Sequence, residues 1–190
     1  MSLNIQKAIV FATLKHQNQK RKGTDIPYIV HPMEVMQILT DMHCTENIII
    51  AGILHDTLED TKTTPKEICD IFGQDILKIV QSESEDKSKT WKERKQNTIN
   101  RLATESTESK IVCFADKFSN IRSMLRDKQN IGEQLWQRFN APKEQIEWYY
   151  RSIAKALKNT PSDGLWDAGK FEELFKEFEE TINNVFVKEF

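Results

Sequence analysis

The segment His55-Asp56-Thr57-Leu58-Glu59-Asp60 carries four ionisable side chains in six residues, and their types suit a metal ion. Adjacent histidine and aspartate side chains offer one ion a nitrogen and an oxygen ligand. The segment directly follows the apolar run 48–54, so it lies beside the core. Charged groups there need a partner or a metal ion. The pattern indicates a metal site, with Glu59 and Asp60 as candidate catalytic groups that orient a water molecule or accept its proton.

The alternative interpretation of this segment is a solvated helix end that carries exposed acidic residues. Acidic side chains at a helix C-terminus oppose the helix dipole, which disfavours that alternative. If residues 46–59 form one helix, His55 and Glu59 share a face, and so do Asp56 and Asp60. We therefore predict a double row of ligand-type side chains at the end of a helix over 46–59.

Two other positions can complete a ligand set. His31 precedes a proline where a helix opens, and Asp116 lies inside an apolar helical stretch. Each alone is typical of a structural or surface residue. Together with His55 and Asp56 they form a set of two histidines and two aspartates from three separate helices. Mixed imidazole and carboxylate ligands suit manganese, iron or another first-row divalent metal ion with open water positions.

The order of these four residues resembles the H…HD…D pattern of the HD-domain metal-dependent phosphohydrolases. Flanking segments at 21–32 and 115–120 are similar to the first and last boxes of the RelA/SpoT hydrolase domain. Residues 82–88 and 93–95 look closest to its single-domain branch, which holds the small alarmone hydrolases and the metazoan SpoT homologue. The resemblance covers about residues 4–157.

The resemblance implies a manganese-dependent hydrolase that removes pyrophosphate from the 3′ position of guanosine 3′,5′-bis(diphosphate), (p)ppGpp, leaving GDP or GTP. Two departures leave the nucleotide preference open. Ser119 stands where the long enzymes commonly carry histidine, and residues 82–90 lack their Thr-Lys element. One alternative is a phosphohydrolase acting on a deoxynucleoside monophosphate or NADPH. Another is a non-catalytic nucleotide-binding module, which the full set of ionisable residues disfavours.

Local cations must bind such a phosphate-rich substrate, because the whole chain has a net charge of −2. Arg21 can stack on a base or fork onto phosphate, and Lys22 can approach phosphate. The alternative is a solvated basic run over 20–22. Lys87, Arg94 and Lys95 are further candidates for contacts with the pyrophosphate, although charged loops and helix faces are usually solvated.

Two polar residues follow Asp116 on the same expected helix face. Asn120 and Ser123 lie four and seven residues after it, a spacing that keeps all three on one side of a helix. The resemblance places nucleotide contacts at such positions. The alternative is a helix face with ordinary polar contacts.

Helical spacing of apolar residues dominates the chain, and strand-like alternation does not persist. We predict an all-α fold, an HD-domain helical bundle with an extra C-terminal helix. Residues 1–158 form the expected hydrolase domain, and 159–190 a turn plus an amphipathic helix that either packs on the domain or mediates self-association. Expected boundaries are a capping box at Thr64 with Pro65 at the first helical position, and a break at Gly73. The remaining helices are expected over 91–104, 109–125, 131–157 and 167–187.

The bulk properties exclude several classes of protein. The near-neutral charge does not indicate nucleic acid or a membrane surface as a partner, and the longest apolar run is too short to span a bilayer. The N-terminus shows no secretory signal pattern. Three separated cysteines favour a reduced, cytoplasmic compartment. We expect a small nucleotide as the partner, and the sequence leaves a homo-oligomer open.

Overall fold

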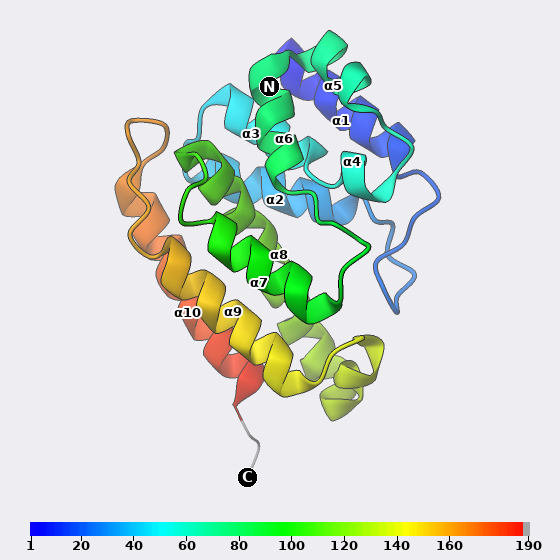
Figure 1. Ribbon diagram of the computed structural model, residues 1–190, viewed down its shortest axis with the longest axis vertical. Helices are drawn as coiled ribbons and strands as arrows, with labels where there is room; N and C mark the ends of the chain where they lie inside the picture. Colours follow the sequence, from blue (N-terminus) through cyan, green and yellow to red (C-terminus); the bar gives the residue numbers. More distant parts are fainter. Residues whose placement is uncertain (188–190) are drawn as a thin grey trace.

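The computed structural model describes residues 1–187, and every regular element in that range is a helix (Figure 1). This confirms the predicted all-α class; the last three residues of the expected extension 159–190 lie outside the described part. No helix within it combines the length and the apolar character needed to cross a membrane. In chain order the elements are α1 (Leu3–Lys15), α2 (Val30–Asp41), α3 (Glu46–Leu54), α4 (Thr57–Asp60), α5 (Pro65–Phe72), α6 (Gln74–Ser82), α7 (Trp91–Arg101), α8 (Thr107–Ile131), the 3-10 helix η1 (Gly132–Arg138), α9 (Lys143–Leu157) and α10 (Ala168–Phe186).

Helix α8 lies at the centre of the fold (Figure 1). It packs against α2, α3 and α6 from the first half of the chain and against η1, α9 and α10, which follow it. All residues from Ile111 to Asp116 are buried. An acidic residue in such a stretch points into the protein, so α8 carries Asp116 toward the helices that precede it.

Helices α2 and α3 approach each other closely at Gly52. A Cβ atom at this position would lie 2.3 Å from Leu39 Cδ1 and 3.2 Å from Val35 Cγ1. Both distances are shorter than ordinary contacts between carbon atoms, so a larger residue would force the two helices apart. The absence of a side chain at Gly52 therefore keeps the start of α2 near the end of α3, where the candidate ligands lie.

Helix α10 packs on α8 and α9 through aromatic side chains. The Phe114 ring of α8 lies 5.2 Å from Phe171, 5.8 Å from Phe175 and 5.6 Å from Phe178, measured between ring centroids. Each such pair typically adds about 0.5–1.5 kcal/mol beyond the burial of its area. Helix α10 therefore stabilises the helix that carries Asp116.

Local capping signals start the helices where the sequence predicts. The Thr64 hydroxyl accepts from the Glu67 amide at 3.2 Å, while Glu67 Oε2 accepts from the Thr64 amide at 2.8 Å. This capping box and Pro65 at the first helical position confirm the predicted start of α5. The predicted break at Gly73 is also confirmed, since α5 and α6 meet there.

The predicted continuous helix over 46–59 is wrong, because α3 ends at Leu54 and the chain turns before α4. The Thr57 hydroxyl donates to the Leu54 carbonyl at 2.7 Å. The His55 Nδ1 atom lies 2.8 Å from the Gly52 carbonyl oxygen. These side chains occupy carbonyls that backbone amides would occupy in a continuing helix. The predicted double row of ligands therefore has no single helix to carry it, and His55-Asp56 forms the turn itself.

The predicted helix over 131–157 is also wrong, because two residues interrupt it. Helix α8 continues to Ile131 and ends at Gly132, whose φ of 57° lies in the left-handed region that favours glycine. The 3-10 helix η1 follows. Pro142 is extended, with φ −61° and ψ 153°, and helix α9 begins after it. Proline lacks an amide hydrogen and keeps the preceding residue out of the helical region, so it separates α9 from η1.

Candidate metal centre

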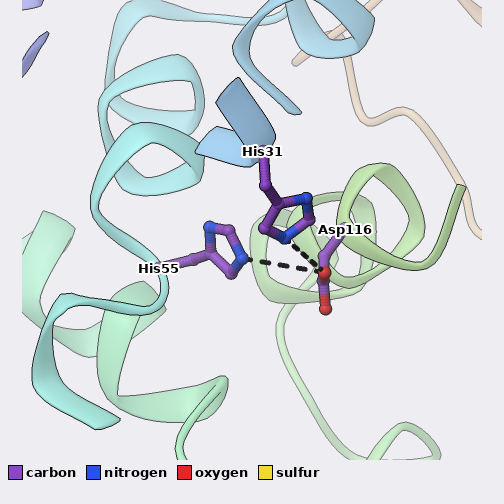
Figure 2. Close-up of side chains that lie close together, drawn as sticks. All are labelled: His31, His55 and Asp116. Atoms are coloured by element: carbon purple, nitrogen blue, oxygen red, sulfur yellow. Dashed lines mark ion pairs between the residues drawn. The ribbon is translucent and has the colours of Figure 1, made fainter. Parts of the chain in front are cut away.

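Four candidate ligands meet in one small volume beside α8 (Figure 2 shows three of them). Asp116 Oδ1 lies 3.1 Å from His31 Nε2 and 3.7 Å from His55 Nε2. Asp56 Oδ2 lies 2.9 Å from His55 Nε2 and 3.5 Å from His31 Nε2. His31, His55 and Asp116 form a group whose ligand atoms all lie within 4.8 Å of one another, as a shared metal ion requires. The structure thus brings together the four residues predicted as ligands.

The four candidate ligands come from three separate segments of the chain. His31 lies in the first turn of α2, His55 and Asp56 form the turn between α3 and α4, and Asp116 lies within α8. Both imidazoles are 1% exposed and the Asp116 residue is 5% exposed. Buried polar groups at this density require compensation by hydrogen bonds or by an ion.

The hydrogen bonding of His55 fits a metal ligand. Its Nδ1 atom lies against the Gly52 carbonyl oxygen, which only accepts, so Nδ1 carries the hydrogen. Its Nε2 atom is buried and has no hydrogen-bond partner within residues 1–187, although the Asp56 carboxylate is nearby. An imidazole held through Nδ1–H by a carbonyl and presenting Nε2 is the usual arrangement of a metal-bound histidine.

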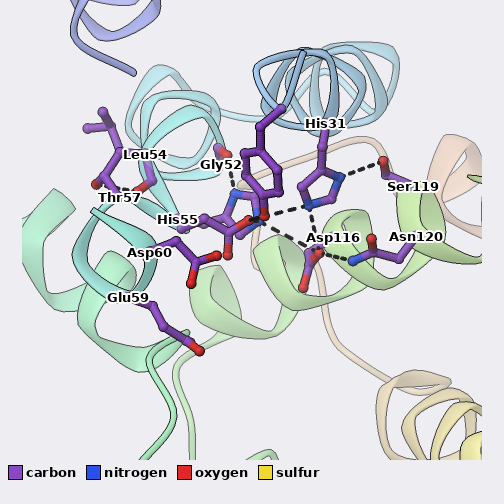
Figure 3. A network of polar contacts seen from close by, with 12 residues as sticks. His31, Gly52, Leu54, His55, Thr57, Glu59, Asp60, Asp116, Ser119 and Asn120 are labelled. Atoms are coloured by element: carbon purple, nitrogen blue, oxygen red, sulfur yellow. Dashed lines mark hydrogen bonds and ion pairs between the residues drawn. The ribbon is translucent and has the colours of Figure 1, made fainter. Parts of the chain in front are cut away.

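A network of side chains orients the two aspartates that are candidate ligands (Figure 3). The Tyr28 hydroxyl donates to Asp56 Oδ2 at 2.5 Å, and Asn120 Nδ2 donates to Asp116 Oδ1 at 2.5 Å. Lys117 donates to the other oxygen of Asp116. Neither Tyr28 nor Lys117 was predicted from the sequence. A signal for Lys117 is present, since it is a charged residue that directly follows the aspartate in an apolar stretch.

The buried charged groups of the site shift one another's pKa values. Burial raises the pKa of Asp116, but Lys117 and the two histidines outweigh it and hold this pKa well below its usual range. Burial lowers the pKa of His31 below the ordinary histidine value, against the opposing effect of Asp116. The site therefore favours an ionised Asp116 beside a neutral His31 imidazole. Burial lowers the pKa of His55, but Asp56 and Asp116 outweigh it and raise this pKa well above the ordinary histidine value. Metal binding needs both imidazoles neutral, so an ion would displace the proton of His55.

A cavity of about 170 Å³ opens from these residues toward the loop before α7. Glu59 lines it, and its Oε2 atom accepts from the Glu85 amide at 3.2 Å. The Asp60 side chain is more exposed, at 36% against 19% for Glu59, and lies 3.0 Å from Lys87 Nζ. Glu83, which the sequence analysis did not predict, also lines this cavity, and burial raises its pKa to about 7. The cavity is therefore acidic on the side away from α8.

A second cavity of about 300 Å³ adjoins the first, and its walls are partly aromatic. Four residues line both cavities, namely Tyr28, Lys95, Lys117 and Asn120. Trp91 and Tyr149 line the second, and the buried Tyr149 hydroxyl has no hydrogen-bond partner among the described residues. An aromatic cavity with cations at its mouth suits a planar base that carries phosphates.

The residues predicted to bind substrate divide between these cavities. Arg21, Lys22, Asn120 and Ser123 all line the second cavity, and the Arg21 guanidinium donates to Asn120 Oδ1 at 3.2 Å. Arg94 and Lys95 line the first cavity, where they pair with Glu85 at 3.1 and 2.8 Å. Lys87 lines neither cavity; its ammonium donates to Asp60 and to the Glu59 carbonyl, and it lies 3.6 Å from the Glu59 carboxylate.

An all-α fold with a histidine and aspartate cluster at the junction of three helical segments defines the class of protein. The sequence model of the HD domain matches residues 8–141. The chain belongs to the HD-domain family.

Named relatives narrow its place in that family. A Xenopus tropicalis protein named guanosine-3′,5′-bis(diphosphate) 3′-pyrophosphohydrolase MESH1 is 33% identical over 174 residues, covering 90% of this chain and 92% of that protein. A solved structure described as a metazoan ortholog of SpoT that hydrolyzes ppGpp has a TM-score of 0.73 and 26% identity, covering 93% of this chain and 96% of the other. The GTP pyrophosphokinase rsh of Brucella melitensis is 38% identical over 126 residues, but the match spans only 17% of its length. These matches confirm the resemblance to RelA/SpoT proteins and their single-domain branch.

Proposed function

We propose that this protein is a metal-dependent hydrolase that removes the 3′-pyrophosphate of (p)ppGpp, giving GDP or GTP and pyrophosphate. One observation carries the proposal: a cluster of histidine and aspartate ligands opens into an acidic cavity that continues into an aromatic, cation-lined one. The names of the MESH1 relative and of the SpoT ortholog support the same reaction. The first cavity would hold the reacting phosphates and the second the guanosine.

The proposed metal ligands are His31, His55, Asp56 and Asp116, and the proposed ion is Mn²⁺. Two imidazoles and two carboxylates leave positions for water on a first-row divalent ion. Such an ion supplies Lewis-acid activation of water and of the attacked phosphoryl group. The Tyr28 and Asn120 side chains hold the two carboxylates in place by hydrogen bonds.

Hydrolysis adds water across the bond between the ribose 3′ oxygen and phosphorus. A proton must leave the attacking water, and a proton must reach the departing 3′ oxygen. We assign Glu59 as the proton acceptor because its carboxylate lines the cavity beside the ligands. We assign Asp60 a supporting role, since it is more exposed and is held by Lys87. Burial raises the pKa of Glu59, which makes its carboxylate a better proton acceptor.

The proposed substrate contacts follow the two cavities. Arg21 and Lys22 would bind the guanosine side with Asn120 and Ser123, which line the same wall. Arg94 and Lys95 would contact the pyrophosphate, because they lie beside the acidic cavity. For Lys87 the geometry supports only an indirect role through Asp60.

We also propose that residues 1–158 form the hydrolase domain and 159–190 an extension. Within the described residues, α10 of this extension packs on α8 and α9. Its proposed contribution is to support α8, which carries Asp116, and not to contact the nucleotide.

The decisive assay incubates the protein with Mn²⁺ and ppGpp, GDP, dAMP or NADPH in parallel, with products separated by ion exchange. We expect ppGpp to give GDP and pyrophosphate and GDP to be a poor substrate, because GDP lacks the 3′-diphosphate. EDTA should stop the reaction and added Mn²⁺ should restore it. Survival of ppGpp while dAMP or NADPH is consumed would refute the alarmone assignment and leave a metal phosphohydrolase of another nucleotide.

Replacing Arg21 with alanine is expected to raise KM with little change in kcat. The guanidinium lines the second cavity, away from the ligands, so its contacts with substrate persist from ground state to transition state. Losing a charged hydrogen bond costs about 1.5–3 kcal/mol, which corresponds to an increase in KM of about 10–100-fold. Steady-state kinetics with ppGpp measure this, with Arg151→Ala on the exposed face of α9 as the control. A fall in kcat at unchanged KM would contradict the assignment.

A further inference from the structure

We infer that Ser119 and Glu34 form a hydrogen-bond relay that fixes which nitrogen of His31 faces the metal site. Neither residue touches the proposed ion, so both are positioning residues. The inference rests on the metal centre of the proposed function. It concerns Ser119 in particular, one of the two places at which the sequence departs from the pattern of the long RelA/SpoT enzymes.

The relay runs from the metal centre to the protein surface. His31 Nδ1 lies 2.9 Å from Ser119 Oγ (Figure 3), and Ser119 Oγ donates to Glu34 Oε2 at 2.8 Å. Arg126 donates to the other oxygen, Glu34 Oε1, at 2.7 Å. Ser119 is fully buried, whereas the Glu34 and Arg126 side chains are 30% and 53% exposed. A surface ion pair is therefore connected to a buried ligand through one hydroxyl group.

The direction of each hydrogen bond follows from the chemistry of the groups. The Glu34 carboxylate only accepts, so the single hydroxyl hydrogen of Ser119 points to Glu34. The Ser119 oxygen must then accept from His31, and His31 Nδ1 must carry the hydrogen. The unprotonated Nε2 atom is left facing Asp116 Oδ1 at 3.1 Å and Asp56 Oδ2 at 3.5 Å. Without a cation, an Nε2 lone pair that faces two carboxylates is electrostatically unfavourable. A divalent cation bound between these groups requires this arrangement.

Glu34→Gln reverses this relay with almost no change in shape. Arg126 has only donors, so the glutamine oxygen must face Arg126 and its NH₂ group must face Ser119. The Ser119 hydroxyl then accepts from glutamine and donates to His31 Nδ1. This bond favours the imidazole tautomer with hydrogen on Nε2, which leaves no nitrogen lone pair facing the metal site.

We expect Glu34→Gln to weaken Mn²⁺ binding by about 10–100-fold, the usual effect of losing a partner behind a metal-bound histidine. Isothermal titration of the metal-free protein with Mn²⁺ measures this. Glu177→Gln is the matched control, because Glu177 also forms a surface ion pair with an arginine of α8, Arg122, but has no contact with a ligand. Circular dichroism checks that the variants remain folded.

The double variant Glu34→Gln/Arg126→Met separates reversal of the relay from simple damage. Without Arg126 the glutamine is free to rotate and present its oxygen to Ser119, so most of the Mn²⁺ affinity should return. Arg126→Met alone leaves the Glu34 carboxylate as acceptor and should change the affinity by about twofold or less. A structural role of Glu34 would make the double variant at least as weak as Glu34→Gln.

Nitrogen-15 NMR of the Zn²⁺-loaded wild type gives an independent readout. Hydrogen on Nδ1 and metal on Nε2 of His31 supports the relay, and the reverse overturns it. Unchanged Mn²⁺ affinity in Glu34→Gln, or a double variant that recovers nothing, also overturns the relay while leaving the proposed hydrolase intact. If the wild type binds no divalent ion, the metal centre of the proposed function fails, and the relay fails with it.

Discussion

Replacing Glu59 with glutamine is expected to lower kcat for ppGpp by about 10²–10⁴-fold, the range for loss of one positioned acid–base group. The change keeps the size of the side chain and removes its ability to accept a proton. Glu59 lines the cavity next to the cluster but is not part of the predicted ligand set. Its loss should therefore leave Mn²⁺ affinity within a few-fold of the wild type. The measurement is kcat together with bound metal, determined on the same preparation.

Asp60→Asn is the matched comparison for this prediction. Asp60 is the more exposed of the two carboxylates and is held by Lys87, so we expect a smaller loss of kcat than in Glu59→Gln. Full activity in Glu59→Gln would remove its assigned role. A loss of metal equal to the loss of activity would instead make Glu59 part of the metal site. A larger loss in Asp60→Asn would exchange the roles of the two residues.

Asp116→Asn is expected to abolish Mn²⁺ binding in the micromolar range and to reduce hydrolysis by about 10³-fold or more. Metal activation supplies several kcal/mol of transition-state stabilisation, and each 1.36 kcal/mol corresponds to about tenfold in rate. Asp116 faces both histidines and is the proposed ligand on the central helix α8. Titration with Mn²⁺ and the ppGpp assay measure the two effects.

The same substitution should also destabilise the metal-free fold. The Lys117 side chain is 15% exposed and donates to Asp116. Partial burial lowers the pKa of this lysine, but Asp116 outweighs it and raises the pKa well above its usual value. Removing one partner of a buried ion pair costs about 3–5 kcal/mol, which denaturant unfolding can detect. Asp116→Asn/Lys117→Met should recover stability without recovering metal binding. Recovery of both would mean that Asp116 is structural and not a ligand.

The local signals in the sequence determined much of the secondary structure. The capping box at Thr64 and the glycine at 73 give helix boundaries because their hydrogen bonds and backbone angles involve residues only a few positions apart. The two segments wrongly predicted as continuous helices also contain local signals that end a helix. The Thr57 hydroxyl binds a carbonyl that a continuous helix over 46–59 would use for a backbone hydrogen bond. Gly132 and Pro142 interrupt the segment 131–157. Apolar periodicity outweighed these signals in the prediction.

The sequence also determined which residue types could form the metal centre, because a histidine–aspartate pair after an apolar run is costly without compensation. Only the tertiary structure decided how they meet. His31 and Asp116 are far apart in the chain and meet through the packing of α2 against α8. The close packing of α2 on α3, which the absence of a side chain at Gly52 allows, brings His31 and His55 together. Long-range packing of this kind leaves no local pattern in the sequence.

The surroundings of the centre likewise required the fold. Glu59 and Asp60 are indistinguishable as neighbouring acids in the sequence. In the fold Glu59 lines a cavity, whereas Asp60 is more exposed and lies closer to Lys87, which pairs with both carboxylates. In the sequence, Ser119 is only a difference from the motif of similar proteins. The fold places Glu34 of α2 beside it and so gives its hydroxyl a hydrogen-bond acceptor. Residue types and short-range hydrogen bonds can be read along the chain, whereas burial, protonation and the direction of a hydrogen bond depend on atoms that only folding brings into contact.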